Sequence, residues 1–292
     1  MLRAERETTA RERRMGSFMA AVEPGTEPFR ACYGPWSVVL GASEGLGEAF
    51  ARDAAGRGLN VVVAARRAGP IESVAAALRS DFGVEARAAV LDLGSPDFLA
   101  GLRPVTDDVD VGLVIFNGTG SFVGPFLDEG RDHASEQVAI NVEAPITCCD
   151  HFGRSMVERG RGGIVLMGSG AGVAGTAGLA VYSATKAFML TLAQALHEEW
   201  RARGIDVLGV VGPAIDTPNF RRSFDHDPNQ LPRPAMSPDE VAVEVLDALG
   251  HEMEMMPGAA NHEGYRMLSA MPRIDQARAL SATFAATQRS ES

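Results

Sequence analysis

Short apolar runs rich in Val, Ile and Leu alternate with longer segments of helical periodicity from Trp36 onward. Most of the runs are continuously apolar, as expected for strands that are covered on both faces. In the segment 71–78, by contrast, apolar residues recur at i, i+3, i+4 and i+7, which is the spacing of one helix face. The pattern predicts strands at Ser37–Leu40, Asn60–Ala64, Ala88–Leu91, Leu113–Phe116, Gly163–Met167 and Asp206–Val211.

The order of these elements indicates the fold class. Ser237-Pro238-Asp239-Glu240 has the pattern of a helix capping box with proline in the first turn, and Gly250 is placed to end that helix. A further candidate strand lies near Glu254–Met256. Repeated strand–helix units imply an α/β fold with a doubly wound parallel sheet of about seven strands and helices on both faces.

No linker or internal repeat interrupts this pattern, so we expect a single domain. The arginine-rich start of the chain is not followed by an apolar segment, which argues against a secretory signal, and Met15 or Met19 is an alternative start. The segment 218–236, rich in Pro, Asp and Arg, predicts a long irregular loop over the substrate. The expected divisions are a flexible extension at 1–30, the domain at 31–275 and a C-terminal tail at 276–292.

Composition narrows the class of function and the compartment. A net charge of −11 over 292 residues argues against nucleic acid as a partner, because nucleic-acid binding needs basic surface. No apolar run reaches the roughly 18 residues of a membrane span. The three cysteines suggest no disulfide framework and favour a reducing, cytoplasmic location. The six histidines lack the spacing of metal ligands, so no metal site is expected.

A glycine-rich turn follows the first predicted strand directly. Gly41, Gly45 and Gly47 give the spacing G-x-x-x-G-x-G, with Ser43 and Leu46 among the intervening residues, and a helical segment comes next. Glycines allow the backbone to approach a pyrophosphate closely, and a helix N-terminus supplies positive potential and N–H groups. The turn therefore predicts dinucleotide binding by a Rossmann-type fold.

The end of the second strand bears on which dinucleotide is bound. NAD-binding folds carry an acidic residue there for the ribose 2′-hydroxyl, whereas this chain has Arg66 and Arg67. A guanidinium suits a 2′-phosphate, so Arg66 favours NADP(H), with NAD(H) still possible. Glu44 in the glycine turn slightly weakens that prediction. Asp92, after the third strand, is placed to reach the adenine or to cap the strand end.

The chain has one lysine among its 27 basic residues, and this Lys186 lies four positions after Tyr182. Residues i and i+4 of a helix share a face, so both side chains can flank one small volume. An adjacent ammonium is expected to lower the pKa of a phenol toward the operating pH. Ser169 lies 13 residues before Tyr182.

With these motifs in this order, the chain resembles the compact branch of the short-chain dehydrogenase/reductase family over roughly 36–217. The resemblance implies that Tyr182 exchanges a proton with a carbonyl or alcohol, that Ser169 binds the same oxygen, and that Lys186 also holds the nicotinamide ribose. Asn141 would anchor a water that relays protons from Lys186. The cofactor contacts implied with the turn are Asp92, Leu93, Asn117, Ile215, Thr217, Tyr182 and Lys186.

Two departures from the family pattern leave an alternative open. The usual Asn-Asn-Ala-Gly after the fourth strand is Phe116-Asn117-Gly118-Thr119 here, and the usual Pro-Gly after the sixth strand is reversed as Gly212-Pro213. Both could alter the geometry at the cofactor. A noncatalytic NADPH-binding sensor is therefore a second hypothesis, and an epimerase or dehydratase of the extended branch is a third. The retained catalytic residues argue against the noncatalytic sensor, and the glycine spacing argues against the extended branch.

The sequence around Ser169 bears on the size of the substrate. The residues at 168–175 are small, which leaves room for a bulky ligand, and Phe220 and Phe224 could supply an apolar cover. We expect a lipophilic ketone/secondary alcohol pair as the substrate. The resemblance also implies a homodimer or homotetramer through the helix that follows Tyr182.

Overall fold

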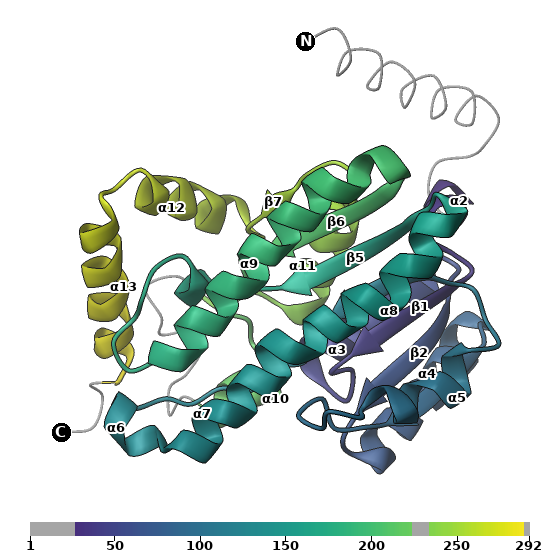
Figure 1. Ribbon diagram of the computed structural model, residues 1–292, viewed down its shortest axis with the longest axis horizontal. Helices are drawn as coiled ribbons and strands as arrows, with labels where there is room; N and C mark the ends of the chain where they lie inside the picture. The colour runs from purple at the N-terminus through teal and green to yellow at the C-terminus, as the bar shows by residue number, and fades with distance from the viewer. Residues whose placement is uncertain (1–26, 224–233, 289–292) are drawn as a thin grey trace, which may run out of the picture.

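Alternate residues of the central strands point to opposite faces of one parallel sheet, and each face is covered by helices (Figure 1). The computed structural model describes residues 27–223 and 234–288. The seven strands are β1 (Trp36–Leu40), β2 (Asn60–Ala65), β3 (Ala86–Val90), β4 (Val111–Phe116), β5 (Gly162–Met167), β6 (Ile205–Val210) and β7 (Glu254–Met255). Each predicted strand is present, including the short seventh one, with ends shifted by one or two residues.

The sheet order is β3-β2-β1-β4-β5-β6-β7, and all neighbouring strands are parallel. The chain reverses its direction of winding between β1 and β4, and ligands of open α/β sheets bind in the crevice at such a point. The described α-helices are α2 (Glu27–Tyr33), α3 (Gly45–Gly56), α4 (Ala68–Phe82), α5 (Leu99–Thr106), α6 (Phe126–Glu129), α7 (Arg131–Val138), α8 (Ala144–Arg159), α9 (Ala180–Trp200), α10 (Pro218–Ser223), α11 (Pro238–Ala248), α12 (Ala259–Ser269) and α13 (Arg273–Gln288).

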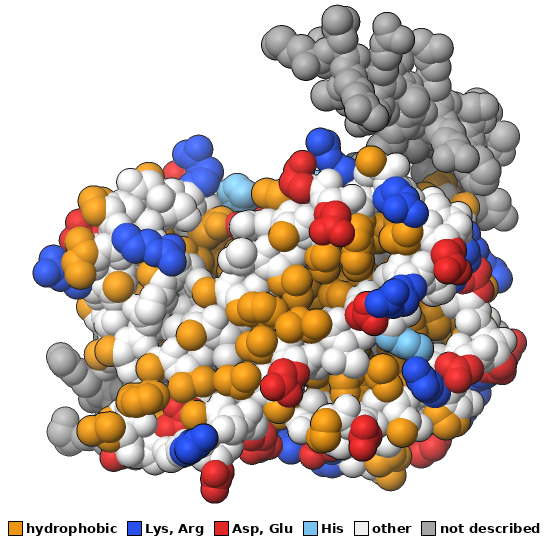
Figure 2. Space-filling view, in the orientation of Figure 1, with side chains coloured by type: hydrophobic (Ala, Val, Ile, Leu, Met, Phe, Trp, Pro, Cys, Tyr) orange, Lys and Arg blue, Asp and Glu red, His pale blue; other side chains and the backbone are white. Residues whose placement is uncertain are grey.

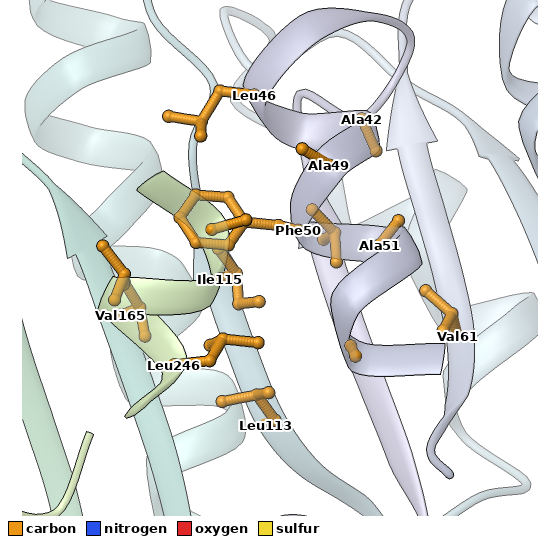
Figure 3. Packing of buried hydrophobic residues seen from close by; sticks show 14 of the residues in the cluster. Ala42, Leu46, Ala49, Phe50, Ala51, Val61, Leu113, Ile115, Val165 and Leu246 are labelled. Carbon is orange, nitrogen blue, oxygen red and sulfur yellow. The ribbon is translucent and has the colours of Figure 1, made fainter. Parts of the chain in front are cut away.

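One face of the sheet packs against α3, α4 and α11. Phe50 of α3 is fully buried and points toward β4 and α11, the elements that carry Ile115 and Leu246 (Figure 3). The predicted helix face of α4 is buried as well, and the capping box of α11 is formed, with Ser237 accepting from the Asp239 N–H. Propensity, capping and burial therefore agree on this side.

The opposite face packs against α5, α8 and α9, whose apolar residues form a second cluster with the other residues of each strand. Cys148 and Cys149 lie inside this cluster, and burial raises the pKa of both thiols, to about 12 for Cys149. They are therefore uncharged apolar side chains of the core. No helix in the two described ranges combines the length and apolarity that crossing a membrane requires.

Both expected domain boundaries fall inside helices, and the expected irregular loop contains one. Residues 27–30, assigned to the flexible extension, begin α2, where Phe29 packs edge-on against Tyr33 at 4.7 Å. The irregular loop expected at 218–236 begins as α10, while residues 224–233 lie outside the described residues. The boundary expected at 275 falls inside α13, whose Gln276 is buried. Residues 1–26, with both alternative start sites, also lie outside the described ranges.

Candidate active site

The glycine turn joins β1 to α3 and leaves no room for a side chain at Gly41 or Gly47. A Cβ on Gly41, which has φ +82°, would lie 2.7 Å from the Gly118 Cα, and one on Gly47 would lie 2.1 Å from the Gly41 carbonyl oxygen. Helix α3 starts at Gly45 without a side-chain cap. The N-terminal N–H groups of α3 and a bare backbone therefore meet at one point, which fits the pyrophosphate of a dinucleotide.

A cavity of about 720 Å³ opens at the carboxyl ends of the strands, beside this turn. Its size lies within the usual range for small-molecule sites. Of the predicted residues, Gly45 and Gly47 shape the turn, and Asn141 lies buried behind the wall. The others all line the cavity: Gly41, Ser43, Leu46, Arg66, Asp92, Leu93, Asn117, Ser169, Tyr182, Lys186, Ile215 and Thr217.

Three hydroxyl groups from separate segments converge on the cavity. Tyr182 stands on the first turn of α9, and the hydroxyls of Ser169 and Thr119 lie near enough to its phenol to lower the pKa of that group. The Ser169 Oγ also accepts from the Ala171 N–H at 3.2 Å, which fixes the start of a 3-10 turn, Gly170–Gly172. Sequence reasoning assigned Thr119 only to an altered turn, and missed it as a partner of the phenol.

Lys186 is buried one turn further along α9. Its Nζ donates to the Met167 carbonyl at the end of β5 at 2.7 Å and lies 5.7 Å from the centroid of the Tyr182 ring. Burial lowers the pKa of Lys186 to about 7. A Cβ on Gly172 would lie 2.7 Å from the Lys186 carbonyl carbon, so the 3-10 turn approaches this part of α9 closely.

The expectation that Lys186 lowers the pKa of Tyr182 is not met. Burial raises the pKa of the phenol above its usual value, and the hydrogen bonds with Ser169 and Thr119 oppose this rise. The same burial that disfavours phenolate also weakens the ammonium, whose pKa falls to about 7. Burial therefore shifts both groups toward their neutral forms, which leaves Lys186 able to gain or lose a proton near pH 7.

Asn141 has a positioning role in the structure. It lies in a π-helical turn, Ala139–Glu143, that joins α7 to α8, and π-turns are frequent at functional sites. Its Nδ2 donates to the Gly120 carbonyl at 2.8 Å and to the Thr185 Oγ1 at 3.0 Å, while its Oδ1 accepts from the Gly120 N–H at 2.9 Å. Asn141 thus ties the loop after β4, which carries Thr119, to helix α9.

The loops after β3 and β4 complete the floor of the cavity. The Asn117 Nδ2 donates to the Gly41 carbonyl at 3.2 Å, so the altered turn after β4 still holds the glycine turn. Asp92 accepts from the Gly94 N–H at 3.0 Å, the capping role that the sequence left open beside an adenine contact. The carboxylate of Asp92 remains exposed at the cavity.

The reversed Gly212-Pro213 leads into a loop that still reaches the cavity. The Gly212 carbonyl accepts from the Gly170 N–H at 2.9 Å, and Ile215 pairs with Met236 as an isolated bridge. The Thr217 Oγ1 then accepts from the Phe220 N–H at 3.0 Å and starts α10. The reversal therefore leaves Ile215 and Thr217 at the cavity, where the sequence placed them.

Arginines gather at the end of the cavity near β2. Arg66 faces Glu136 at 3.8 Å. Arg67 donates to the Ser43 Oγ at 3.2 Å and pairs with Glu44 at 2.9 Å. Arg222 of α10 pairs with the same Glu44. Sequence reasoning chose Arg66 and missed the roles of Arg67, Glu44 and Arg222, because their pairing depends on how α10 lies over the glycine turn.

Helices α12 and α13 form an apolar wall at the other end, which sequence reasoning also missed. They contribute Leu268, Leu280 and Phe284 to the cavity lining. Helix α13 is held to the loop before α9, because the Ser281 Oγ accepts from the Ala177 N–H at 2.9 Å. Within the described ranges, no three His, Cys, Asp or Glu side chains are grouped to hold a metal ion.

Comparison with known proteins agrees with this geometry. The family model described as short chain dehydrogenase matches residues 36–228, well over half of the chain. The chain belongs to the short-chain dehydrogenase family. It is 29% identical over 247 residues to a 7beta-hydroxysteroid dehydrogenase of Clostridium sardiniense, which covers 85% of this chain and 94% of that protein.

Solved structures of similar short-chain dehydrogenases have the same architecture. One, from work on 7beta-hydroxysteroid dehydrogenase stereoselectivity, has a TM-score of 0.81 at 25% identity, over 86% of this chain and 98% of the other. A short-chain dehydrogenase from Sphingobium yanoikuyae in complex with NADPH has a TM-score of 0.72 at 29% identity, over 89% and 98%. The protein is thus an NAD(P)-binding oxidoreductase of the Rossmann fold that acts on CH–OH and C=O groups by hydride transfer.

Proposed function

We propose that this enzyme is an NADP(H)-dependent reductase of bulky, lipophilic ketones, with Tyr182 as its general acid/base. The observation that carries the proposal is the convergence of the Ser169 and Thr119 hydroxyls on the phenol of Tyr182, with the buried Lys186 beside them. A carbonyl oxygen placed at this point would meet one proton donor and further hydroxyl groups at once.

The protonation state of Tyr182 suits reduction. Because burial raises its pKa, the phenol keeps its proton at neutral pH and can give it to a carbonyl oxygen. Ser169 would bind the same oxygen and stabilise the charge that develops there. Lys186, with a pKa of about 7, is poised to return a proton to Tyr182. The bound cofactor supplies the hydride.

The charge at the β2 end of the cavity supports NADP(H). Arg66 and Arg67 stand where NAD-binding folds place an acidic residue, and guanidinium groups bind phosphate through paired hydrogen bonds. A similar enzyme from Sphingobium yanoikuyae was solved with NADPH. The preference for NADP(H) over NAD(H) is therefore part of the proposal.

The apolar wall of α12 and α13 supports a bulky substrate. Leu268, Leu280 and Phe284 face the cavity, and small residues around Ser169 leave room beside the hydroxyl groups. The curated relative acts, by its name, on a hydroxysteroid, which is a rigid and lipophilic substrate. A fused-ring or similarly large ketone is the substrate class that fits this cavity.

We also propose a homo-oligomer in the cytoplasm. Exposed apolar residues gather on the face formed by α6, α7, α8 and α9, and the space-filling view shows this band across the molecule (Figure 2). Leu127 is 90% exposed, and Phe126, Val138 and Ile146 are exposed near it. A second copy would cover this surface. The cytoplasmic location rests on the free cysteines Cys32, Cys148 and Cys149.

The direct test is turnover by the purified enzyme. A panel of ketones from small aliphatic to fused-ring compounds would be reduced with NADPH and, in parallel, with NADH. The proposal expects larger kcat/KM for the bulky ketones and for NADPH. Tight NADPH binding without turnover on any ketone or alcohol would instead support the noncatalytic sensor. Faster turnover with NADH would overturn the cofactor preference alone.

A further inference from the structure

Glu44 holds two arginines that come from opposite sides of the cavity rim. It occupies the third variable position of the glycine turn, and its Oε2 lies 2.9 Å from the Nη2 of Arg67. Its Oε1 pairs with the Nη2 of Arg222. These contacts lower the pKa of Glu44, the hydrogen bond from Arg222 being the largest cause. The carboxylate is therefore charged and keeps both guanidinium groups at the rim.

Arg222 reaches this point because α10 lies directly on the glycine turn. A Cβ on Gly45 would lie 3.0 Å from the Cβ of Thr217, so a larger residue there would press on the segment that starts α10. Arg221, the preceding residue, takes a different partner and donates to both carboxylate oxygens of Asp216, at 2.6 and 2.7 Å. Two consecutive arginines of one helix thus form ion pairs with two different carboxylates. Of the two, Arg222 lines the cavity.

Three arginines gather at this end of the cavity. Arg66, Arg67 and Arg222 carry three positive charges, and the carboxylates around them are Glu44, Glu136 and Asp92. The three side chains of the arginines are more than half exposed, so each can turn toward a ligand. Sequence reasoning counted Glu44 against NADP because it offers no basic contact. In the structure, Glu44 instead forms ion pairs with two basic side chains, Arg67 and Arg222.

We propose that Arg222 binds the 2′-phosphate of NADP(H) together with Arg67, so that α10 helps to determine cofactor specificity; this rests on the proposed preference for NADP(H). The phosphate carries up to two negative charges and three acceptor oxygens, which matches two guanidinium forks held side by side. Because α10 continues from the loop of Ile215 and Thr217, a 2′-phosphate would also fix the segment that borders the substrate. NADH would leave α10 without this anchor.

Adenosine 2′,5′-bisphosphate and 5′-AMP isolate the phosphate contact, because they differ only by the 2′-phosphate. Isothermal titration calorimetry would measure both ligands on the wild type, Arg222→Gln and Arg221→Gln. We expect Arg222→Gln to weaken the bisphosphate about tenfold, the lower range for a hydrogen bond to a charged group, and 5′-AMP less than about twofold. Arg221→Gln should leave the ratio of the two affinities unchanged. Arg222→Lys should recover part of the loss.

A second background separates a direct contact from an unmasked charge. Arg222→Gln also removes a partner of Glu44, whose carboxylate could then repel the phosphate. The comparison of Glu44→Gln with the double variant Glu44→Gln/Arg222→Gln removes this effect. A loss of about tenfold in that background too supports the contact, and no loss overturns it. If the wild type does not prefer the bisphosphate to 5′-AMP, the proposed cofactor preference fails as well. If it does and Arg222→Gln keeps that preference, this inference alone fails.

Discussion

The two ends of the cavity hold their polar groups in opposite ways. The side chains of Asn141 and Lys186 are buried, and each is hydrogen-bonded to a backbone carbonyl or to a neighbouring side chain. At the arginine end, Arg66, Arg67 and Arg222 are exposed, and they pair with the half-buried Glu44 and the exposed Glu136. A buried polar group without a partner costs far more than an exposed one, so the first end is fixed and the second is free to rearrange.

This difference separates catalysis from recognition. Proton transfer needs groups held at fixed positions, and the phenol of Tyr182 is held between two hydroxyl groups on a wall that Asn141 braces. Binding of a phosphate needs charge more than exact position, and the exposed arginines at the rim would supply it to the proposed 2′-phosphate. Substitutions at the first end should therefore change turnover and stability, and those at the second should change only affinity.

Tyr182→Phe should have the largest effect. It removes the hydroxyl while keeping the ring, so turnover should fall by roughly 10²- to 10⁴-fold, the usual contribution of a general acid. NADPH affinity, followed by quenching of protein fluorescence, should change less than about threefold. The measurement is kcat for the best ketone of the panel. A variant that keeps full kcat would show that another group donates the proton.

Asn141→Ala should cost the most in stability. It leaves the Gly120 N–H without its partner and removes one hydrogen bond each from the Gly120 carbonyl and the Thr185 hydroxyl, so the free energy of unfolding should fall by roughly 2–3 kcal/mol. Asn261→Ala is the matched control, because Asn261 lies on α12 and donates only to the Pro257 carbonyl, at 3.2 Å. Urea unfolding measures both. Equal losses in the two variants would contradict a bracing role for Asn141.

Lys186 predicts a dependence of stability on pH. The ordinary pKa of a lysine is about 10.5, and burial lowers that of Lys186 to about 7. Between these values the unfolded chain binds more protons than the folded protein, so the free energy of unfolding rises with pH, and this gain is lost as the pH falls through 7. From pH 7 to pH 9, the free energy of unfolding of the wild type should therefore rise relative to that of Lys186→Met by on the order of 2 kcal/mol. Urea unfolding at both pH values checks it, and an unchanged difference would refute it.

Local patterns in the sequence were enough to locate most of the buried end, although not Thr119 beside the phenol. Continuous apolar runs located the strands, since strands covered on both faces have no polar alternation. The i, i+4 spacing of Tyr182 and Lys186 placed both on one face of a helix, and the resemblance to the family added Ser169 to them. The sequence did not predict whether the pKa of Tyr182 is raised or lowered, because that shift depends on burial by the whole fold.

The rim could not be predicted because its contacts join distant segments. Glu44 and Arg222 are 178 positions apart, and their pairing depends on the path of the chain from Gly212 to α10. The apolar wall likewise needs α13, which the pattern assigned in large part to a tail. The amino-acid sequence of α13 has no strong apolar face, so periodicity alone gave no signal that Phe284 would reach the cavity.

Arg66→Gln should have the smallest effect on stability and completes the comparison. The side chain is 64% exposed and faces Glu136 at 3.8 Å, so the free energy of unfolding should change by less than about 0.5 kcal/mol. Arg57→Gln is the contrast, because Arg57 is 16% exposed, pairs with Asp53 and Asp247 and lies over a phenylalanine ring. Its loss should exceed about 1 kcal/mol by the same urea titration. If both variants lost the same stability, exposure would not be what distinguishes the arginines of the rim, and the freedom to turn toward a phosphate would have to come from another source.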